Sequence, residues 1–240
     1  MDRSSDRTPG EVSLPVSVGT GELRDYLGRP RFTPETSLTE PERRTAVPGV
    51  ATGLAVTGAG GDVLFIEASL ADRETGETGV TLTGQLGDVM KESARIALSY
   101  LRSHGAELDL PVGELKDRGV HVHVPAGAVP KDGPSAGVTM TTALASLLSG
   151  RLVRADVAMT GEVSLTGRVL PIGGVKQKLL AAHRAGVTTV LIPQRNEPDL
   201  DDVPAEVLAK LDVHPVKDVR EVLELALEPA QESVLVPAAA

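Results

Sequence analysis

Alternating and helical patterns of hydrophobic residues fill the chain between residues 49 and 228. Two alternating runs, at 51–57 and 62–70, flank a glycine-rich turn, which predicts a β-hairpin. Strands are further predicted over 80–83, 120–124, 157–159, 168–170 and 189–192. Helices are predicted over 88–104, 135–148, 175–185 and 219–227. Because strands and helices mix without strict alternation, we expect an α+β fold with mixed sheets flanked by helices.

The two ends of the chain lack such patterns. Residues 1–48 are rich in Ser, Thr, Pro and Arg and contain one short helical pattern, at 21–27. This composition predicts a flexible linker or the residual end of another domain. Residues 229–240 are predicted to be a disordered tail, so the expected domain spans 49–228.

Composition excludes several classes of function. The net charge of −9 and an aromatic content of 2% argue against a phosphate-binding surface or stacking platforms, so nucleic acid is not an expected partner. The absence of cysteine excludes disulfides, thiolate nucleophiles and cysteine metal sites. No apolar run resembles a secretion signal or is long enough to cross a membrane, which predicts a cytoplasmic protein.

The segment from Pro130 to Gly137 joins a predicted strand to a predicted helix, and Ser135 opens that helix. Unpaired backbone N–H groups at a helix start can receive an oxyanion, which suits an acyl-transfer nucleophile. Ser is also a common helix N-cap that requires no chemistry. Gly133 and Gly137 permit close backbone approach on both sides of the serine and favour the functional interpretation.

Residues Gly133 to Gly137 also match the G-x-S-x-G nucleophile elbow of α/β-hydrolases. An elbow serine follows its strand directly, whereas about ten residues separate the predicted strand from Ser135. A catalytic triad would need a downstream histidine, and His183 and His214 are the candidates. A serine hydrolase that uses a histidine therefore remains the enzymatic alternative.

A neutral, buried lysine can replace histidine as the base that activates a serine. Lys178 shares the i, i+3, i+4, i+7 stripe of the predicted helix over 175–185, whereas Lys176 lies outside it. Helical phase therefore selects Lys178 as the candidate base. A lysine stem that extends its ammonium to solvent would explain the same pattern. The glycine-rich segment before Lys178 lacks the Gly-Lys-Ser/Thr sequence of a P-loop, so it predicts no nucleotide site.

Three motifs, in order, resemble the proteolytic domain of Lon proteases. They are His121-Val-His-Val-Pro125, the serine loop, and Thr160-Gly-Glu-Val-Ser-Leu-Thr-Gly-Arg-Val-Leu-Pro-Ile-Gly-Gly-Val-Lys-Gln-Lys178. The resemblance covers residues 49–227 and implies a serine endopeptidase with a Ser135–Lys178 dyad. The chain differs from the family at Val56, where the family often has Trp.

The resemblance also implies roles for supporting residues. Thr160 matches the family threonine that orients the lysine, Asp132 and Glu67 match acidic positions near the site, and Gly133 and Ala136 flank the nucleophile. Asp132 suggests a further hypothesis, in which its carboxylate pairs with Lys178 and holds the site inactive. His121 and His123 match the family's paired histidines. Because residues two apart on a strand share one face, we expect them to brace the sheet, and no third ligand is evident for a metal site.

The implied partners are unfolded or damaged protein substrates, five further copies in a homo-hexamer, and an ATPase module. Residues 23–32 resemble the end of that module, so ATP and Mg²⁺ are expected to bind only the module and no cofactor is expected here. A module that assembles rings without catalysis, with Ser135 as a helix cap, is the non-enzymatic alternative.

Overall fold

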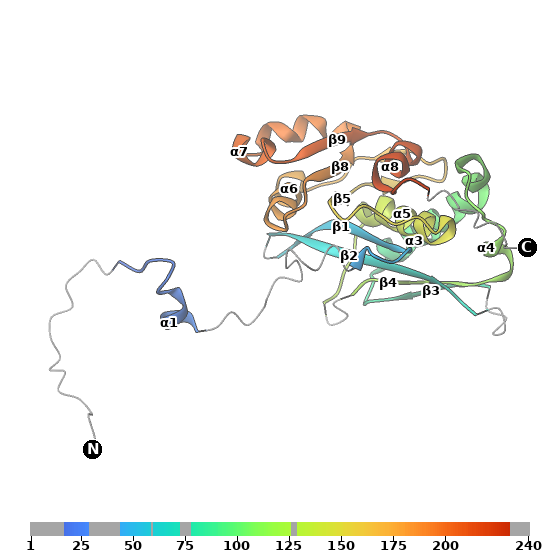
Figure 1. Ribbon diagram of the computed structural model, residues 1–240, viewed down its shortest axis with the longest axis horizontal. Coiled ribbons are helices and arrows are strands. Elements are labelled where there is room, and N and C mark those ends of the chain that lie inside the picture. Colours follow the sequence, from blue (N-terminus) through green and yellow to red (C-terminus); the bar gives the residue numbers. More distant parts are fainter. Residues whose placement is uncertain (1–16, 29–43, 59, 73–77, 126–128, 231–240) are drawn as a thin grey trace, which may run out of the picture. The chain divides into compact units, whose positions relative to one another are not determined.

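The computed structural model describes residues 17–28, 44–58, 60–72, 78–125 and 129–230 (Figure 1). The chain divides into two units, residues 1–35 and 36–240. Within the first unit, helix α1 (Leu23–Leu27) confirms the helix predicted over 21–27, and its side chains are exposed. The remainder of the predicted linker lies largely outside the described residues, as does the predicted tail from residue 231 onward.

A seven-stranded mixed sheet, in the order β3-β4-β2-β1-β5-β8-β9, forms the centre of the second unit. Strands β1 and β2, the first two along the chain, form the predicted hairpin, with Val50 opposite Glu67 and Thr57 opposite Gly60. The strands of this sheet are β1 (Val50–Thr57), β2 (Gly60–Leu70), β3 (Val80–Thr83), β4 (Val120–His123), β5 (Val157–Met159), β8 (Thr189–Pro193) and β9 (Asp212–Val216). A small antiparallel pair is formed by β6 (Glu162–Val163) and β7 (Val169–Leu170).

Helices cover both faces of the sheet. They are α3 (Asp88–His104), α4 (Glu114–Asp117), α5 (Gly137–Ser149), α6 (Val175–Arg184), α7 (Ala205–Leu208) and α8 (Val219–Ala226). Short 3₁₀ segments are η2 (Gly105–Leu108), η3 (Pro134–Ala136) and η4 (Gln194–Asp202). The observed mixed sheet with flanking helices confirms the predicted fold class.

Two hydrophobic cores lie on opposite sides of the sheet. One packs α3, α5 and α8 against the sheet and includes Ile66 and Leu144 (Figure 1). The other packs α6, α7 and η4 against the opposite face and includes Leu179 and Ile192. Alternating residues of β5 and β8 divide between the two cores, as expected for strands buried on both faces. The elements that carry Ser135 and Lys178 therefore belong to different layers.

The structure differs from the sequence-based elements mainly in short segments. The helix predicted from residue 135 begins as η3 and becomes α-helical only at Gly137. Strands β6 and β9 were not predicted, because two residues carry no periodicity and β9 contains Pro215, which is tolerated at a sheet edge. Within the described part of the chain, no helix is long and apolar enough to cross a membrane.

Candidate active site

Ser135 lies in the η3 turn, immediately before α5, and is partly buried. Gly133 begins this turn with a φ of 119°, a conformation that L side chains rarely adopt. The N-cap of η3 is Gly133 and that of α5 is Ala136, so Ser135 caps neither helix. Its hydroxyl has no hydrogen-bond partner among the described residues. The capping interpretation is therefore wrong, and the hydroxyl is available for chemistry.

Gly137 brings a second segment against the serine turn. A Cβ at this position would lie 2.8 Å from Val163 N, so only glycine permits the approach. Two backbone hydrogen bonds result, from Gly161 N to Ser135 O at 2.9 Å and from Val138 N to Gly161 O at 3.0 Å. The residues that follow β5 are thereby held beside Ser135.

Lys178 lies in α6 on the face that packs against the sheet. Its side chain is 3% exposed, whereas Lys176 is exposed, as helical phase predicted. The helix approaches β2 closely, because a Cβ on Gly61 would stand 1.9 Å from Gln177 O. Burial lowers the pKa of Lys178 from 10.5 to about 8. The side chain therefore does not extend its ammonium to solvent, and near pH 8 a substantial fraction is neutral.

Thr160 links the lysine to the serine turn. Lys178 Nζ donates a 2.9 Å hydrogen bond to Thr160 Oγ1, and Thr160 Oγ1 donates a 3.3 Å bond to Ser135 O. Thr160 follows the last residue of β5, so it lies between the layer that carries α5 and the layer that carries α6. Because Thr160 accepts from the amine, the lone pair of a neutral Lys178 is not used by this contact. No direct bond joins Ser135 Oγ to Lys178 Nζ in the described structure.

Asp132 does not pair with Lys178 in this structure. Its Oδ1 accepts hydrogen bonds from Met90 N at 3.0 Å and Gly133 N at 2.8 Å. Met90 lies in the first turn of α3, where a carboxylate is favoured by the unpaired N–H groups. Gly87 makes room for this contact, since a Cβ there would lie 2.2 Å from Asp132 Cγ. The hypothesis of an inhibitory ion pair is not supported, and Asp132 instead fastens the serine loop to α3.

Glu67, His121 and His123 lie on one face of the sheet. Glu67 of β2 is the register partner of His123 in β4. Both histidines contact the hydroxyl of Thr83, His121 Nε2 at 2.8 Å and His123 Nδ1 at 2.7 Å. The described residues include no group of three or more His, Cys, Asp or Glu arranged to hold a metal. These contacts support the bracing role expected for the two histidines.

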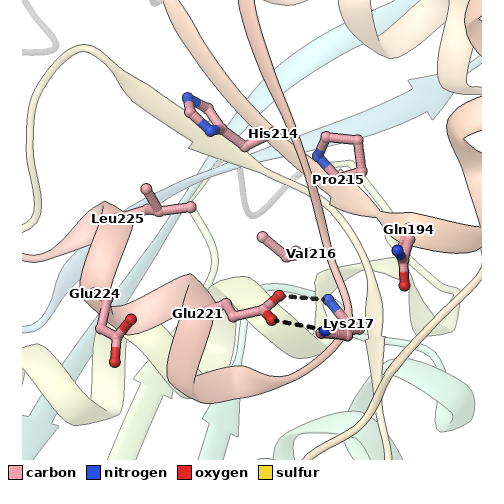
Figure 2. Close-up of a pocket in the computed structure, with 8 residues that line it drawn as sticks. All are labelled: Gln194, His214, Pro215, Val216, Lys217, Glu221, Glu224 and Leu225. Carbon is pink, nitrogen blue, oxygen red and sulfur yellow. Dashed lines mark hydrogen bonds and ion pairs between the residues drawn. The ribbon is translucent and has the colours of Figure 1, made fainter.

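Neither histidine of the hydrolase alternative has a hydrogen bond to Ser135 among the residues that the structure describes. His214 bonds Asp212 at 2.8 Å and lines a pocket between β9 and α8 (Figure 2). That pocket is lined by Gln194, His214, Pro215, Val216, Lys217, Glu221, Glu224 and Leu225, and none of these residues belongs to the predicted Ser-Lys site. In the described structure His183 has no hydrogen bond to Ser135.

Comparison with known proteins gives one consistent result. Residues 17–229 match the sequence model of the Lon protease (S16) C-terminal proteolytic domain. The chain is 81% identical to a Lon protease from Frankia alni over 92% of its length. It is 70% identical over 90% of its length to a Lon protease from Salinispora arenicola, and 64% identical over 95% to one from Mycolicibacterium smegmatis.

The chain spans about a quarter of these relatives, with 25% of the Frankia alni protein and 28% of the Mycolicibacterium smegmatis protein covered. The matched part contains the serine turn, Thr160 and the buried lysine described above. These matches favour a Lon-type peptidase over the α/β-hydrolase alternative. The chain belongs to the Lon protease family and corresponds to its C-terminal proteolytic domain.

Proposed function

We propose that this chain is a serine endopeptidase in which Ser135 is the nucleophile and Lys178 the general base. The observation that carries the proposal is the buried lysine joined through Thr160 to the backbone of Ser135. A buried amine with a pKa of about 8 can be neutral near the pH at which it must accept a proton. The free serine hydroxyl supplies the other half of a Ser-Lys pair.

In the proposed reaction, neutral Lys178 takes the proton of Ser135 Oγ as the oxygen attacks a peptide carbonyl. Backbone N–H groups around Ser135, at the start of η3 and α5, stabilise the oxyanion. The protonated lysine then donates its proton to the leaving amine, and water hydrolyses the acyl-enzyme with Lys178 again as base. Thr160 fixes the amine throughout by accepting a hydrogen bond from one of its N–H groups.

The resting structure requires one adjustment before this reaction. Lys178 Nζ bonds Thr160 rather than Ser135, so the direct contact of the dyad must form when a substrate binds. Catalytic hydrogen bonds are often long or absent without substrate and shorten in the complex. We propose that only side-chain rotation is needed, because the backbone at Ser135 is already tied to Gly161.

The relatives are considerably longer than this chain, which bears on the whole-protein activity. We propose that the chain is the proteolytic part of an ATP-dependent Lon protease. In this proposal an ATPase module delivers unfolded or damaged proteins, six copies form the working assembly, and ATP and Mg²⁺ bind only the module. Cytoplasmic location stays a prediction.

A reagent that reacts with activated serines tests the proposal. A fluorophosphonate or peptide boronate should label the chain at Ser135, and the rate should rise with pH to a plateau, with a midpoint near 8 where Lys178 loses its proton. Ser135→Ala should abolish labelling, whereas Ser103→Ala, at an exposed serine, should not change it. Absence of labelling at every pH would favour a non-catalytic assembly module.

A further inference from the structure

Asn196 is the only asparagine in the chain, and its side chain is 5% exposed. It lies in η4, directly after β8. Its amide makes two hydrogen bonds to a single residue: Ile172 N donates to Oδ1 at 2.9 Å, and Nδ2 donates to Ile172 O at 2.8 Å. The side chain thus imitates a strand partner for Ile172 and fixes both of its backbone groups.

Ile172 belongs to the loop that starts the lysine helix. Gly174 begins α6 in the left-handed conformation, and Lys178 N donates to Gly174 O at 3.0 Å. Gly174 lies two residues after the clamped Ile172, with only Gly173 between them. The clamp therefore fixes the position at which the first turn of α6 begins, and this turn leads directly to Lys178.

The same segment also fixes Thr160. Met159 of β5 is the register partner of Leu191 in β8, and Thr160 N donates to Leu191 O at 3.0 Å. Asn196 follows five residues after Leu191 in this continuous segment. One stretch of backbone, β8 followed by η4, therefore holds Thr160 at one end and the start of the lysine helix at the other.

We propose that Asn196 is a positioning residue for the peptidase reaction, which sets Lys178 against Thr160 by clamping Ile172. This inference rests on the proposed Ser135–Lys178 chemistry. Asp199 orients the Asn196 amide, because its Oδ2 accepts a 2.6 Å hydrogen bond from the second N–H of that amide. The carboxylate thereby fixes which end of the amide faces Ile172 N and which faces Ile172 O.

The experiment compares three variants of the chain by the rate at which a fluorophosphonate labels Ser135 between pH 6 and 10.5. Asn196→Ala removes the clamp, and Asp199→Ala leaves the amide but removes its orienting acceptor. Gln194→Ala is the matched control, since it removes an exposed amide from the same η4 segment. Thermal unfolding of each variant is measured in parallel.

We expect Asn196→Ala to lower the labelling rate at pH 8 by roughly 10- to 100-fold, because small displacements of a catalytic group have effects of this size. Water reaching the displaced lysine should also move the midpoint of the pH profile upward by about one unit. Asp199→Ala should shift the midpoint in the same direction by a smaller amount, and Gln194→Ala should match the parent chain.

A clamp that serves stability alone would lower the unfolding temperature of Asn196→Ala and leave the rate and midpoint unchanged, which would overturn the proposal. If Asn196→Ala does not fold, Asp199→Ala decides, since an unchanged midpoint in that variant contradicts the inference. Failure of the parent chain to label at Ser135 is a separate result, which contradicts the proposed function itself.

Discussion

Replacing Lys178 by methionine is expected to reduce the rate at which Ser135 is acylated by a peptide ester by about 100- to 10,000-fold. Methionine fills similar space in the buried position but cannot accept the serine proton. Single-turnover acylation of the chain at pH 8 measures this step without an ATPase module. The loss should appear in the acylation rate rather than in substrate affinity, because the amine acts on the reacting oxygen.

Lys176→Met is the matched control for this prediction. Lys176 lies on the same helix, two residues away, and its side chain is exposed. Removing its charge should change the acylation rate little. If Lys178→Met retained the parent rate, or if Lys176→Met lost as much activity, the assignment of the general base would be wrong.

The same Lys178→Met variant is expected to be more stable than the parent at neutral pH. The pKa of Lys178 is about 8 in the folded chain and near 10.5 when exposed, so the unfolded state binds more protons between these values. Parent stability should therefore rise as pH increases from 8 to 10.5. Below pH 8 the buried charge of Lys178 lowers the free energy of unfolding of the parent by about 3 kcal/mol. The variant avoids this cost but loses the hydrogen bond to Thr160, which contributes roughly 1 kcal/mol.

Urea unfolding at several pH values measures this effect. The variant should exceed the parent by about 2 kcal/mol at pH 7, and the difference should decline as pH rises above 8 and Lys178 of the folded parent becomes neutral. Lys176→Met should show no such pH dependence. A Lys178→Met variant that is less stable than the parent at pH 7 would show that burial of the charged lysine does not destabilise the folded chain.

The sequence predicted those features of the site that depend on local pattern. Helical phase separated Lys178 from Lys176 because α6 packs one face against the sheet along its whole length. The serine turn was recognisable because its glycines mark close backbone approach, which the structure shows at Gly137. Elements with long regular patterns, such as α3 over Asp88–His104, were predicted with their correct bounds.

Features that depend on tertiary neighbours were not predictable in this way. Asp132 caps α3, an element far from it in the sequence, because Gly87 leaves the helix start open to an outside carboxylate. The sequence marks Asn196 only as the single asparagine of the chain. Its partner Ile172 is 24 residues away, so the contact between them follows no local pattern. The role of Thr160 came from family resemblance, since its contacts depend on how β5 lies between two helical layers.

The central claim is that Ser135 and Lys178 act as a pair. The measurement that tests it most directly is the structure of this chain with a peptide boronate bonded to Ser135, because tetrahedral boron imitates the intermediate of acyl transfer. We expect Lys178 Nζ to lie about 2.6–3.2 Å from Ser135 Oγ in that complex while it keeps its contact with Thr160. A complex in which Lys178 still bonds only Thr160, with another group in contact with Ser135 Oγ, would contradict the proposed dyad.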